Sequence, residues 1–263
     1  MSGPAALFEV KGPIGLITFN RPDNRNAMTA ELLDAFSQAT LAARQDESIR
    51  VLVITGTGSC FSAGADLKAD LQREHRMRPL QPHERSYAMY EPFLSVLDIE
   101  VPVIAALNGH AVGGGFGLSL LCDLRIANSA SRYGANFAKI GLHSGLGISY
   151  LLPRLIGATT ASEMLFAGRL LSGAEAAGCR LVNAAYDAND IFPQAMKLAE
   201  EIANAAPIAV RMMKRTLYRG LGWEIRRAAY EEAYAQAITV ETEDMREGIN
   251  ALLEKRPPQF KGR

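Results

Sequence analysis

One stretch, residues 101–127, constrains the fold more than any other part of the chain. An apolar, β-branched run leads into three consecutive glycines at 113–115, and an apolar helical segment follows. Asp123 then precedes a second short apolar run. The first turn of a helix has unsatisfied N–H donors and the positive end of a dipole, and glycine allows close approach to the main chain. This stretch is therefore suited to holding a negatively charged group.

The patterns before this stretch predict parallel strands joined by a helix. Residues 7–10 and 14–20 are strand-like runs around Lys11-Gly12-Pro13, which favours a hairpin. Thr29 is placed to cap an amphipathic helix, and residues 50–55 form an apolar run typical of a buried strand. Strand, helix and strand at this spacing indicate a parallel βαβ unit, hence an α/β core.

Two glycine-containing loops each follow one of the predicted strands. FSAGADL (61–67) comes after the strand at 50–55, and GHAVGGGFG comes after VPVIAAL. If parallel strands bring both loops to one sheet edge, their N–H groups converge on a single oxygen, which is the geometry of an oxyanion hole. The alternative is that these glycines only turn the chain, and the pattern leaves both interpretations open.

Other glycine signatures are absent. The dinucleotide fingerprint GxGxxG does not close, because its third glycine would fall on Leu118 or Leu120. No phosphate loop GxxxxGK[ST] occurs, and the nucleophile elbow GxSxG fails at Ser62, since Cys60 stands at its first glycine position. Nucleotide-binding and serine-hydrolase interpretations are weakened accordingly.

Charge and cysteine content narrow the class of protein further. Lys+Arg and Asp+Glu both number 28, so no net field favours nucleic acid or an anionic membrane. The three cysteines are widely spaced, which fits a reducing compartment and offers no metal-ligand spacing. No apolar run reaches the ~18 residues of a membrane span, and no signal peptide is visible. We expect a cytoplasmic protein that contacts neither membrane nor nucleic acid and holds no metal.

Two further regions carry predictions about organisation. Residues 66–91 are polar and broken by prolines, which favours a surface excursion or an active-site cover. From about Ser172 the pattern turns helical, and the long run from Trp223 to Lys255 has an interruption near Gly248. The sequence therefore predicts an α/β core followed by an all-helical region.

Several motifs together resemble the enoyl-CoA hydratase/isomerase (crotonase) family, in the family's order and over nearly the whole chain. They are NRPDNRNAM (20–28), FSAGADL (61–67), PVIAALNGHAVGGG (102–115), CDLRIA (122–127), LPRLIG (152–157), GRLLSGAEAAGCRLV (168–182) and TEDMREGINALLEKRPPQF (242–260). The resemblance implies an α/β fold with a spiral core of repeated ββα turns, expected at 1–200. It also implies a C-terminal helical region, expected at 201–263, that mediates trimers, commonly paired into hexamers.

The resemblance implies an acyl-CoA thioester as ligand, with coenzyme A as part of the substrate and no separate cofactor. The backbone N–H groups of Ala65 and Gly114 would form the oxyanion hole. Arg25 is a candidate phosphate contact, and basic residues at 255–261 are candidate contacts to a neighbouring subunit's CoA. The implied substrate-binding set is Arg25, Ala27, Ala63, Asp66, Leu67, Gly113, Gly117 and Phe137.

The sequence departs from the family where the family places its acid/base carboxylates. Hydratases have one glutamate two residues after the glycine triplet, where this chain has Gly117, and a second at the position of Phe137. Dienoyl isomerases and aryl-CoA dehalogenases use an aspartate where this chain has Gly145. Neither glycine nor phenylalanine transfers a proton, so hydration by paired carboxylates is in doubt.

His143 is the titratable side chain closest in sequence to the vacated loop, so it is a candidate substitute acid/base, with a structural role as the alternative. The leading hypothesis is a hydratase or isomerase acting on an acyl-CoA through an enolate. The competing hypothesis is a catalytically silent acyl-CoA binder. A third is another enolate reaction, such as C–C bond cleavage, with a relocated base.

Overall fold

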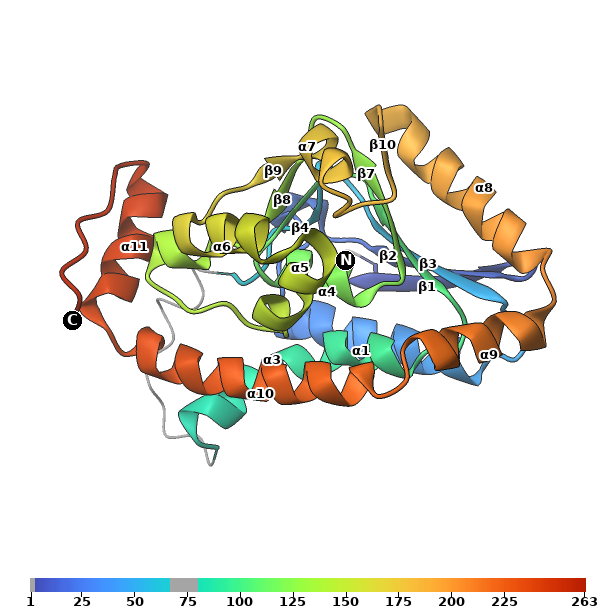
Figure 1. Ribbon diagram of the computed structural model, residues 1–263, viewed down its shortest axis with the longest axis horizontal. Helices are drawn as coiled ribbons and strands as arrows, with labels where there is room; N and C mark the ends of the chain where they lie inside the picture. The colour runs from blue at the N-terminus through green and yellow to red at the C-terminus, as the bar shows by residue number, and fades with distance from the viewer. Residues whose placement is uncertain (1–2, 67–79) are drawn as a thin grey trace.

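The computed structural model describes residues 3–66 and 80–263. Its strands form two sheets that are surrounded by helices (Figure 1). The larger sheet has the order β1 (Ala6–Lys11), β2 (Ile14–Phe19), β3 (Val51–Gly56), β5 (Val103–Leu107), β7 (Leu124–Asn128), β10 (Ala184–Tyr186). The smaller has the order β4 (Cys60–Ser62), β6 (His110–Val112), β8 (Arg132–Gly134), β9 (Leu171–Ser172).

The helices follow the strands in chain order. They are α1 (Ala30–Gln45), α3 (Pro82–Leu94), α4 (Gly114–Leu121), α5 (Ile148–Ile156), α6 (Ala158–Ala167), α7 (Gly173–Gly178), α8 (Ile191–Ala203), α9 (Pro207–Leu217), α10 (Leu221–Val240) and α11 (Glu243–Glu254). Short 3-10 turns are η1 (Pro22–Asn24), η2 (Ser95–Asp98), η3 (Phe137–Ile140) and η4 (Ala188–Asp190).

The chain winds as a spiral between the two sheets. In the successive pairs β3–β4, β5–β6 and β7–β8, the first strand joins the larger sheet and the second joins the smaller one. All neighbours from β2 to β10, and from β4 to β8, are parallel, so each turn of the spiral needs a crossover to return to the sheet. The predicted α/β class and the spiral of repeated turns are confirmed.

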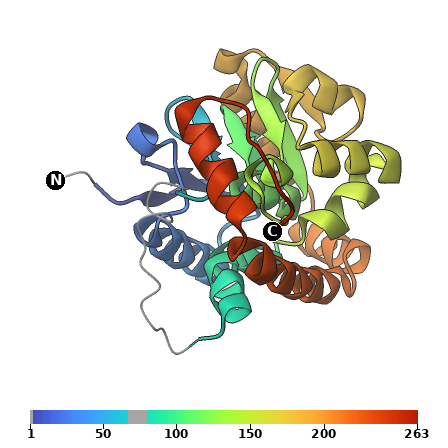
Figure 2. The same cartoon turned by 90° about the vertical axis from the view of Figure 1, so that its left-hand side faces the viewer.

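The core has two parts, because successive residues of a strand point to opposite faces of the larger sheet. On β3, Val51 and Val53 pack toward α8, whereas Leu52 and Ile54 point to the opposite side, where the main core lies. This alternation is the two-residue period of a strand with both faces covered. On the main-core side, Figures 1 and 2 show α1, α3 and α10 packed side by side.

The predicted N-terminal elements are confirmed. β1 and β2 form the antiparallel hairpin, and the turn between them contains Gly12 at φ +60°. The Thr29 side chain accepts a hydrogen bond from the Leu32 amide at 3.2 Å, which caps α1. The βαβ unit is β2, α1 and β3, with β2 parallel to β3.

The second half of the segment 66–91 does not match its predicted surface role. It forms most of α3, in which Tyr90 is 2% exposed and the following Phe93 is fully buried. The Phe93 ring packs edge-on against Phe36 with centroids 5.1 Å apart, so α3 is an integral part of the core. Its amphipathic pattern was hidden by the polar residues at its start. Residues 67–79 lie outside the described part of the chain.

Two details of the predicted C-terminal region are wrong. The region from Ser172 is not all helical, because β10 adds a parallel strand beside β7. The break in the last long helical run falls at Thr242, whose hydroxyl caps α11 by accepting the Met245 amide at 3.1 Å. Gly248 instead lies inside α11, where a Cβ would be 2.5 Å from the Ile140 carbonyl carbon. The boundary expected at residue 200 falls within α8.

A partly buried ion pair fastens α9 to the core. The Lys214 ammonium lies 2.7 Å from the Asp123 carboxylate and 2.8 Å from the Val101 carbonyl oxygen. Asp123 also accepts the Val103 amide at 2.6 Å, so this carboxylate joins β5, β7 and α9. Apart from this anchor, α9 is peripheral, and none of its residues is buried in the single chain.

Candidate functional site

The two glycine loops meet, which is one of the two possibilities that the sequence left open, because β4 and β6 are parallel neighbours in the smaller sheet. Gly64 follows β4 and has φ +80°, and Gly113 follows β6 and has φ +57°. A Cβ added to Gly64 would lie 2.7 Å from the Val112 carbonyl oxygen and 3.1 Å from the Gly114 amide nitrogen. Only glycine permits this backbone conformation and this approach of one main chain to another.

Two amide groups at this contact have no protein acceptor. The N–H groups of Ala63, Gly64 and Gly113 bond respectively to Arg25 O at 3.0 Å, Ser62 Oγ at 3.3 Å and Gly134 O at 3.1 Å. By contrast, the N–H groups of Ala65 and Gly114 bond to no acceptor within residues 3–66 and 80–263. Gly114 is the first residue of α4, where unpaired donors and the helix dipole favour negative charge.

The loop before α1 supports this contact from one side. Its Met28 amide donates to Gly64 O at 2.8 Å, and Ser62 Oγ donates to Asn26 O at 2.8 Å. Asn26 is fully buried with φ +52°, and its side-chain amide donates to Cys60 O at 2.9 Å. Asn26 is a site residue that the sequence motifs did not indicate. Only one feature of the sequence could have pointed to this residue: asparagine tolerates positive φ, and residues 20–28 are rich in turn-forming residues.

Each glycine of the triplet is favoured for its own reason. Gly113 has positive φ, a Cβ on Gly114 would lie 2.2 Å from the Met28 sulfur, and a Cβ on Gly115 would lie 2.4 Å from Ser62 O. The sequence signalled the glycines, but Met28 and Ser62 are found only in the structure. The three glycines therefore allow α4 to pack closely against the two loops.

The structure brings most of the predicted substrate-binding residues to these loops. Ala27 is buried beside Met28, Arg25 is exposed, and Ala63 is bonded to Arg25 through the main chain. Asp66 is the last described residue before the gap, and Leu67 lies outside the described residues.

Phe137 also lies at the site. It begins η3, and its ring atom Cζ would be 3.7 Å from a Cβ on Gly113. Gly113 and Gly117 are one helical turn apart and therefore lie on the same face of α4. Phe137 covers the N-terminal end of this face.

Gly117 and Gly145 stand where the family resemblance places carboxylates, and other side chains already occupy the space beside both glycines. A Cβ on Gly117 would lie 2.7 Å from Leu146 Cδ2, and Leu146 is fully buried. A Cβ on Gly145 would lie 2.3 Å from the Tyr90 hydroxyl, which donates to the Gln236 side chain at 2.7 Å. Leu146 and Tyr90 carried no signal in the sequence, because they reach the site from a later loop and from α3. This side of the site is therefore lined by apolar and phenolic groups.

His143 is half-buried in the loop between η3 and α5. Its Nδ1 lies 2.8 Å from the Ser144 carbonyl oxygen, and because a carbonyl only accepts, Nδ1 carries the proton. In the neutral ring, Nε2 then has a free lone pair. The His143 main chain is fixed by α10, since its N–H donates to Thr239 Oγ1 at 3.1 Å and its carbonyl accepts Gln236 Nε2 at 3.0 Å.

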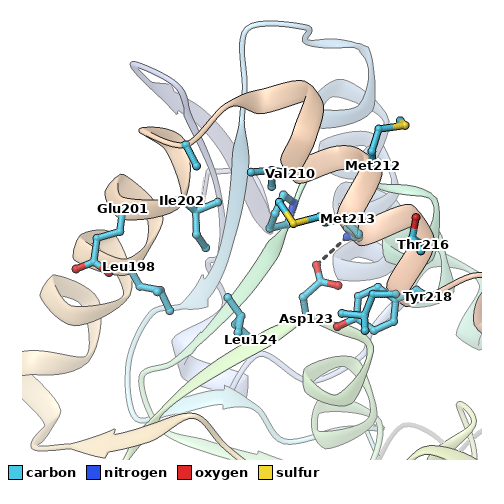
Figure 3. Close-up of a pocket in the computed structure, with 14 residues that line it drawn as sticks. Asp123, Leu124, Leu198, Glu201, Ile202, Val210, Met212, Met213, Thr216 and Tyr218 are labelled. Carbon is cyan, nitrogen blue, oxygen red and sulfur yellow. Dashed lines mark hydrogen bonds and ion pairs between the residues drawn. The ribbon is translucent and has the colours of Figure 1, made fainter.

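A large groove lies elsewhere, between α8 and α9 (Figure 3). It has a volume of about 900 Å³ and is lined mainly by apolar side chains, with Asp123, Lys214 and Tyr218 among its polar ones. Figure 3 shows Asp123 and Tyr218 close together beneath α9. Burial, followed by the Asp123 charge, raises the pKa of Tyr218 to about 12, so this phenol stays neutral. No predicted site residue lines this groove.

Within residues 3–66 and 80–263, no group of three or more His, Cys, Asp and Glu side chains is placed to hold a metal ion. Burial raises the pKa of Cys122 to about 12, so it remains a neutral thiol. Across the same residues, none of the helices combines the length and apolarity needed to cross a membrane.

Known proteins resemble this chain in both sequence and structure. A profile described as enoyl-CoA hydratase/isomerase matches residues 9–263. A crotonyl-CoA hydratase of Syntrophomonas wolfei is 33% identical over 255 residues, covering 97% of this chain and 96% of that protein. A 2,3-dehydroadipyl-CoA hydratase of Escherichia coli is 33% identical over 248 residues, covering 94% and 95% respectively. A crystal structure of carnitinyl-CoA hydratase from Mycobacterium avium matches with a TM-score of 0.86 and 33% identity, covering 99% of both chains.

We expect Gly114→Ala to lower the free energy of unfolding by about 1–3 kcal/mol, because the added methyl group would overlap the Met28 sulfur. Urea denaturation at fixed protein concentration measures this change. Gly178→Ala is the matched control, since no atom lies within 4 Å of its added Cβ. Combining Gly114→Ala with Met28→Ala should relieve the overlap and recover part of the loss. An unchanged midpoint for Gly114→Ala alone would contradict the packing described.

Proposed function

This chain belongs to the enoyl-CoA hydratase/isomerase family, and from that premise we propose that it binds an acyl-CoA thioester and stabilises the enolate of its acyl group. The N–H groups of Ala65 and Gly114 would hold the thioester oxygen. The observation that carries this proposal is that these two amides lack protein acceptors in the described chain at the contact between the β4 and β6 loops.

The chemistry needs fixed donors at this place. When a proton leaves the carbon next to a thioester carbonyl, negative charge develops on the carbonyl oxygen. Main-chain N–H groups held by two parallel strands stabilise that charge without reorganising, and removing one such donor costs roughly 3–4 kcal/mol in other enzymes. The start of α4 adds the favourable end of its dipole.

The surroundings favour an apolar acyl group. Phe137 and Leu146 lie against the α4 face that carries Gly113 and Gly117, where they exclude water better than carboxylates would. Arg25 is exposed, and we propose that it contacts a phosphate of the coenzyme A part, which belongs to the substrate and is not a separate cofactor. Roles for Ala27, Ala63, Asp66 and Leu67 along the substrate channel stay predictions, as does a cytoplasmic location.

Hydration or isomerisation is the leading reaction, and it requires a proton carrier other than a carboxylate at Gly117, Phe137 or Gly145. We propose His143 for this role, because the bond from its Nδ1 to Ser144 leaves Nε2 as a free acceptor. A second candidate function is a silent acyl-CoA binder. It is favoured by the observation that Leu146 and Tyr90 fill the space beside the two glycines at carboxylate positions.

We also propose that the chain assembles as a homotrimer, or as a hexamer made from two trimers. The support is the C-terminal region, where α9 has no buried residue in the single chain. Ile208, Leu217, Trp223 and Ile238 are exposed by 73%, 74%, 64% and 72%, which is a large apolar surface on α9 and α10. A second copy of the chain is the occupant that would cover it.

We expect Ala65→Pro to reduce turnover of 2-enoyl-CoA esters about 10²–10³-fold, since proline removes one N–H donor. The loss of enoyl absorbance with purified protein measures turnover, and calorimetry with acyl-CoA and free CoA measures binding. Ala65→Ser is the control, because it keeps the N–H group. Binding without turnover in the unmodified protein would favour the silent binder. Failure to bind any acyl-CoA would refute the proposed function.

We expect His143→Ala to lower turnover about 10²–10⁴-fold if Nε2 transfers the proton. The same absorbance assay measures the effect, with acyl-CoA affinity determined in parallel to separate chemistry from binding. His83→Ala is the control, since His83 stacks on Tyr234 on the outer surface of α3 and α10. Turnover that survives His143→Ala unchanged would rule out this histidine as the proton carrier.

We expect a solution mass of three or six times the 28.5 kDa chain, measured by sedimentation equilibrium at micromolar concentration. Leu217→Glu should shift the mass toward that of a single chain, because it places a charge on the exposed apolar surface. Lys197→Glu, on α8, serves as the control for a charge change. A single-chain mass for the unmodified protein would refute the assembly.

A further inference from the structure

A carboxylate of α10 is buried against the loop that precedes α5. Glu232 is 4% exposed. Its Oε2 accepts the Gly147 amide at 2.6 Å, and its Oε1 accepts the Ser149 amide at 2.7 Å and the Ser149 hydroxyl at 2.5 Å. The Ser144 hydroxyl lies 3.4 Å from the same Oε1. One side chain thus bonds three residues that are more than eighty positions away in the chain.

The environment of Glu232 is unusual for a buried acid. Within residues 3–66 and 80–263, its carboxyl oxygens accept from N–H and O–H donors and pair with no cationic side chain. Two of these donors belong to the first turn of α5, whose N-cap is Gly147. Glu232 therefore caps α5 from another helix, which fixes the position of the loop ahead of it.

The residue held in place by this cap is Leu146. It has φ +66°, a conformation that is costly for a leucine by about 1–3 kcal/mol and persists only where its surroundings enforce it. Its side chain is fully buried and fills the space beside Gly117, with Ile148 Cδ1 3.2 Å from a Cβ at that glycine. Gly117 lies one turn from Gly114, the first residue of α4. The contacts therefore run from Glu232 through Leu146 to the helix that presents the proposed donor.

We propose that Glu232 is a positioning residue that sets the acyl specificity of the site. By holding the loop 144–149, it keeps Leu146 against Gly117 and closes the space there, so that a slim aliphatic acyl group fits and a bulky aromatic one is rejected. This inference rests on the proposed acyl-CoA binding. Its mechanism is steric, because Leu146 occupies the volume that a larger acyl group needs.

The test compares Glu232→Gln with Glu231→Gln. Glu231 is the neighbouring glutamate, and its exposed side chain pairs with Arg227 at 3.2 Å. Glutamine keeps the size of Glu232 but places an amide donor against main-chain donors. Calorimetry measures the affinities for butyryl-CoA and benzoyl-CoA, and amide hydrogen exchange measures protection of residues 144–149. In Glu232→Gln we expect faster amide exchange confined to residues 144–149. We also expect the ratio of the affinity for butyryl-CoA to the affinity for benzoyl-CoA to fall about tenfold. Glu231→Gln should change neither quantity.

Leu146→Ala provides a second variant, which opens the same space without touching Glu232. It should lower the ratio of butyryl-CoA affinity to benzoyl-CoA affinity in the same way. If Glu232→Gln does not fold, Leu146→Ala alone tests whether this loop sets the acyl specificity. An unchanged preference in Leu146→Ala, or in a folded Glu232→Gln, would overturn the inference while leaving the proposed function intact. Failure of the unmodified protein to bind either ester would instead overturn the proposed function, and this inference with it.

Discussion

The candidate site depends on how closely two pieces of main chain approach one another after β4 and β6. Parallel pairing of these strands brings Gly64 next to Gly113 and Gly114. Gly64 and Gly113 both have positive φ, and this conformation turns the chain at the contact. The buried Asn26 then holds the end of β4 through the Cys60 carbonyl. If any of these positions carried a bulky side chain, the loops would separate. The amides of Ala65 and Gly114, which have no acceptor among the described residues, would then no longer lie at one place.

The parts of this arrangement that follow from local sequence were predictable. The hairpin, the Thr29 cap and the strand before the glycine triplet all follow from short patterns of apolar residues and glycines, whereas the meeting of the two loops was one of two open possibilities. The family resemblance supplied the spiral fold. What the sequence did not reveal are contacts over long separations: Tyr90 reaches Gly145 from α3, and Glu232 reaches Gly147 from α10. Gly248 was misinterpreted for the same reason, because the need for glycine there comes from η3 and not from α11 itself.

Helix α10 connects the proposed assembly surface with the candidate site. On its inner side, Glu232, Gln236 and Thr239 all bond the loop that contains His143 and Leu146. On its outer side, Trp223 and Ile238 are exposed. The same helix therefore carries both the bonds that hold this loop and part of the exposed apolar surface that we propose as the assembly surface.

The filling of the space beside Gly117 has a consequence for how this protein relates to its carboxylate-bearing relatives. A glutamate introduced at this position would meet Leu146 before it could reach a substrate. A side chain at position 117 and the leucine at position 146 therefore compete for one volume, so the residue tolerated at either position depends on the residue at the other.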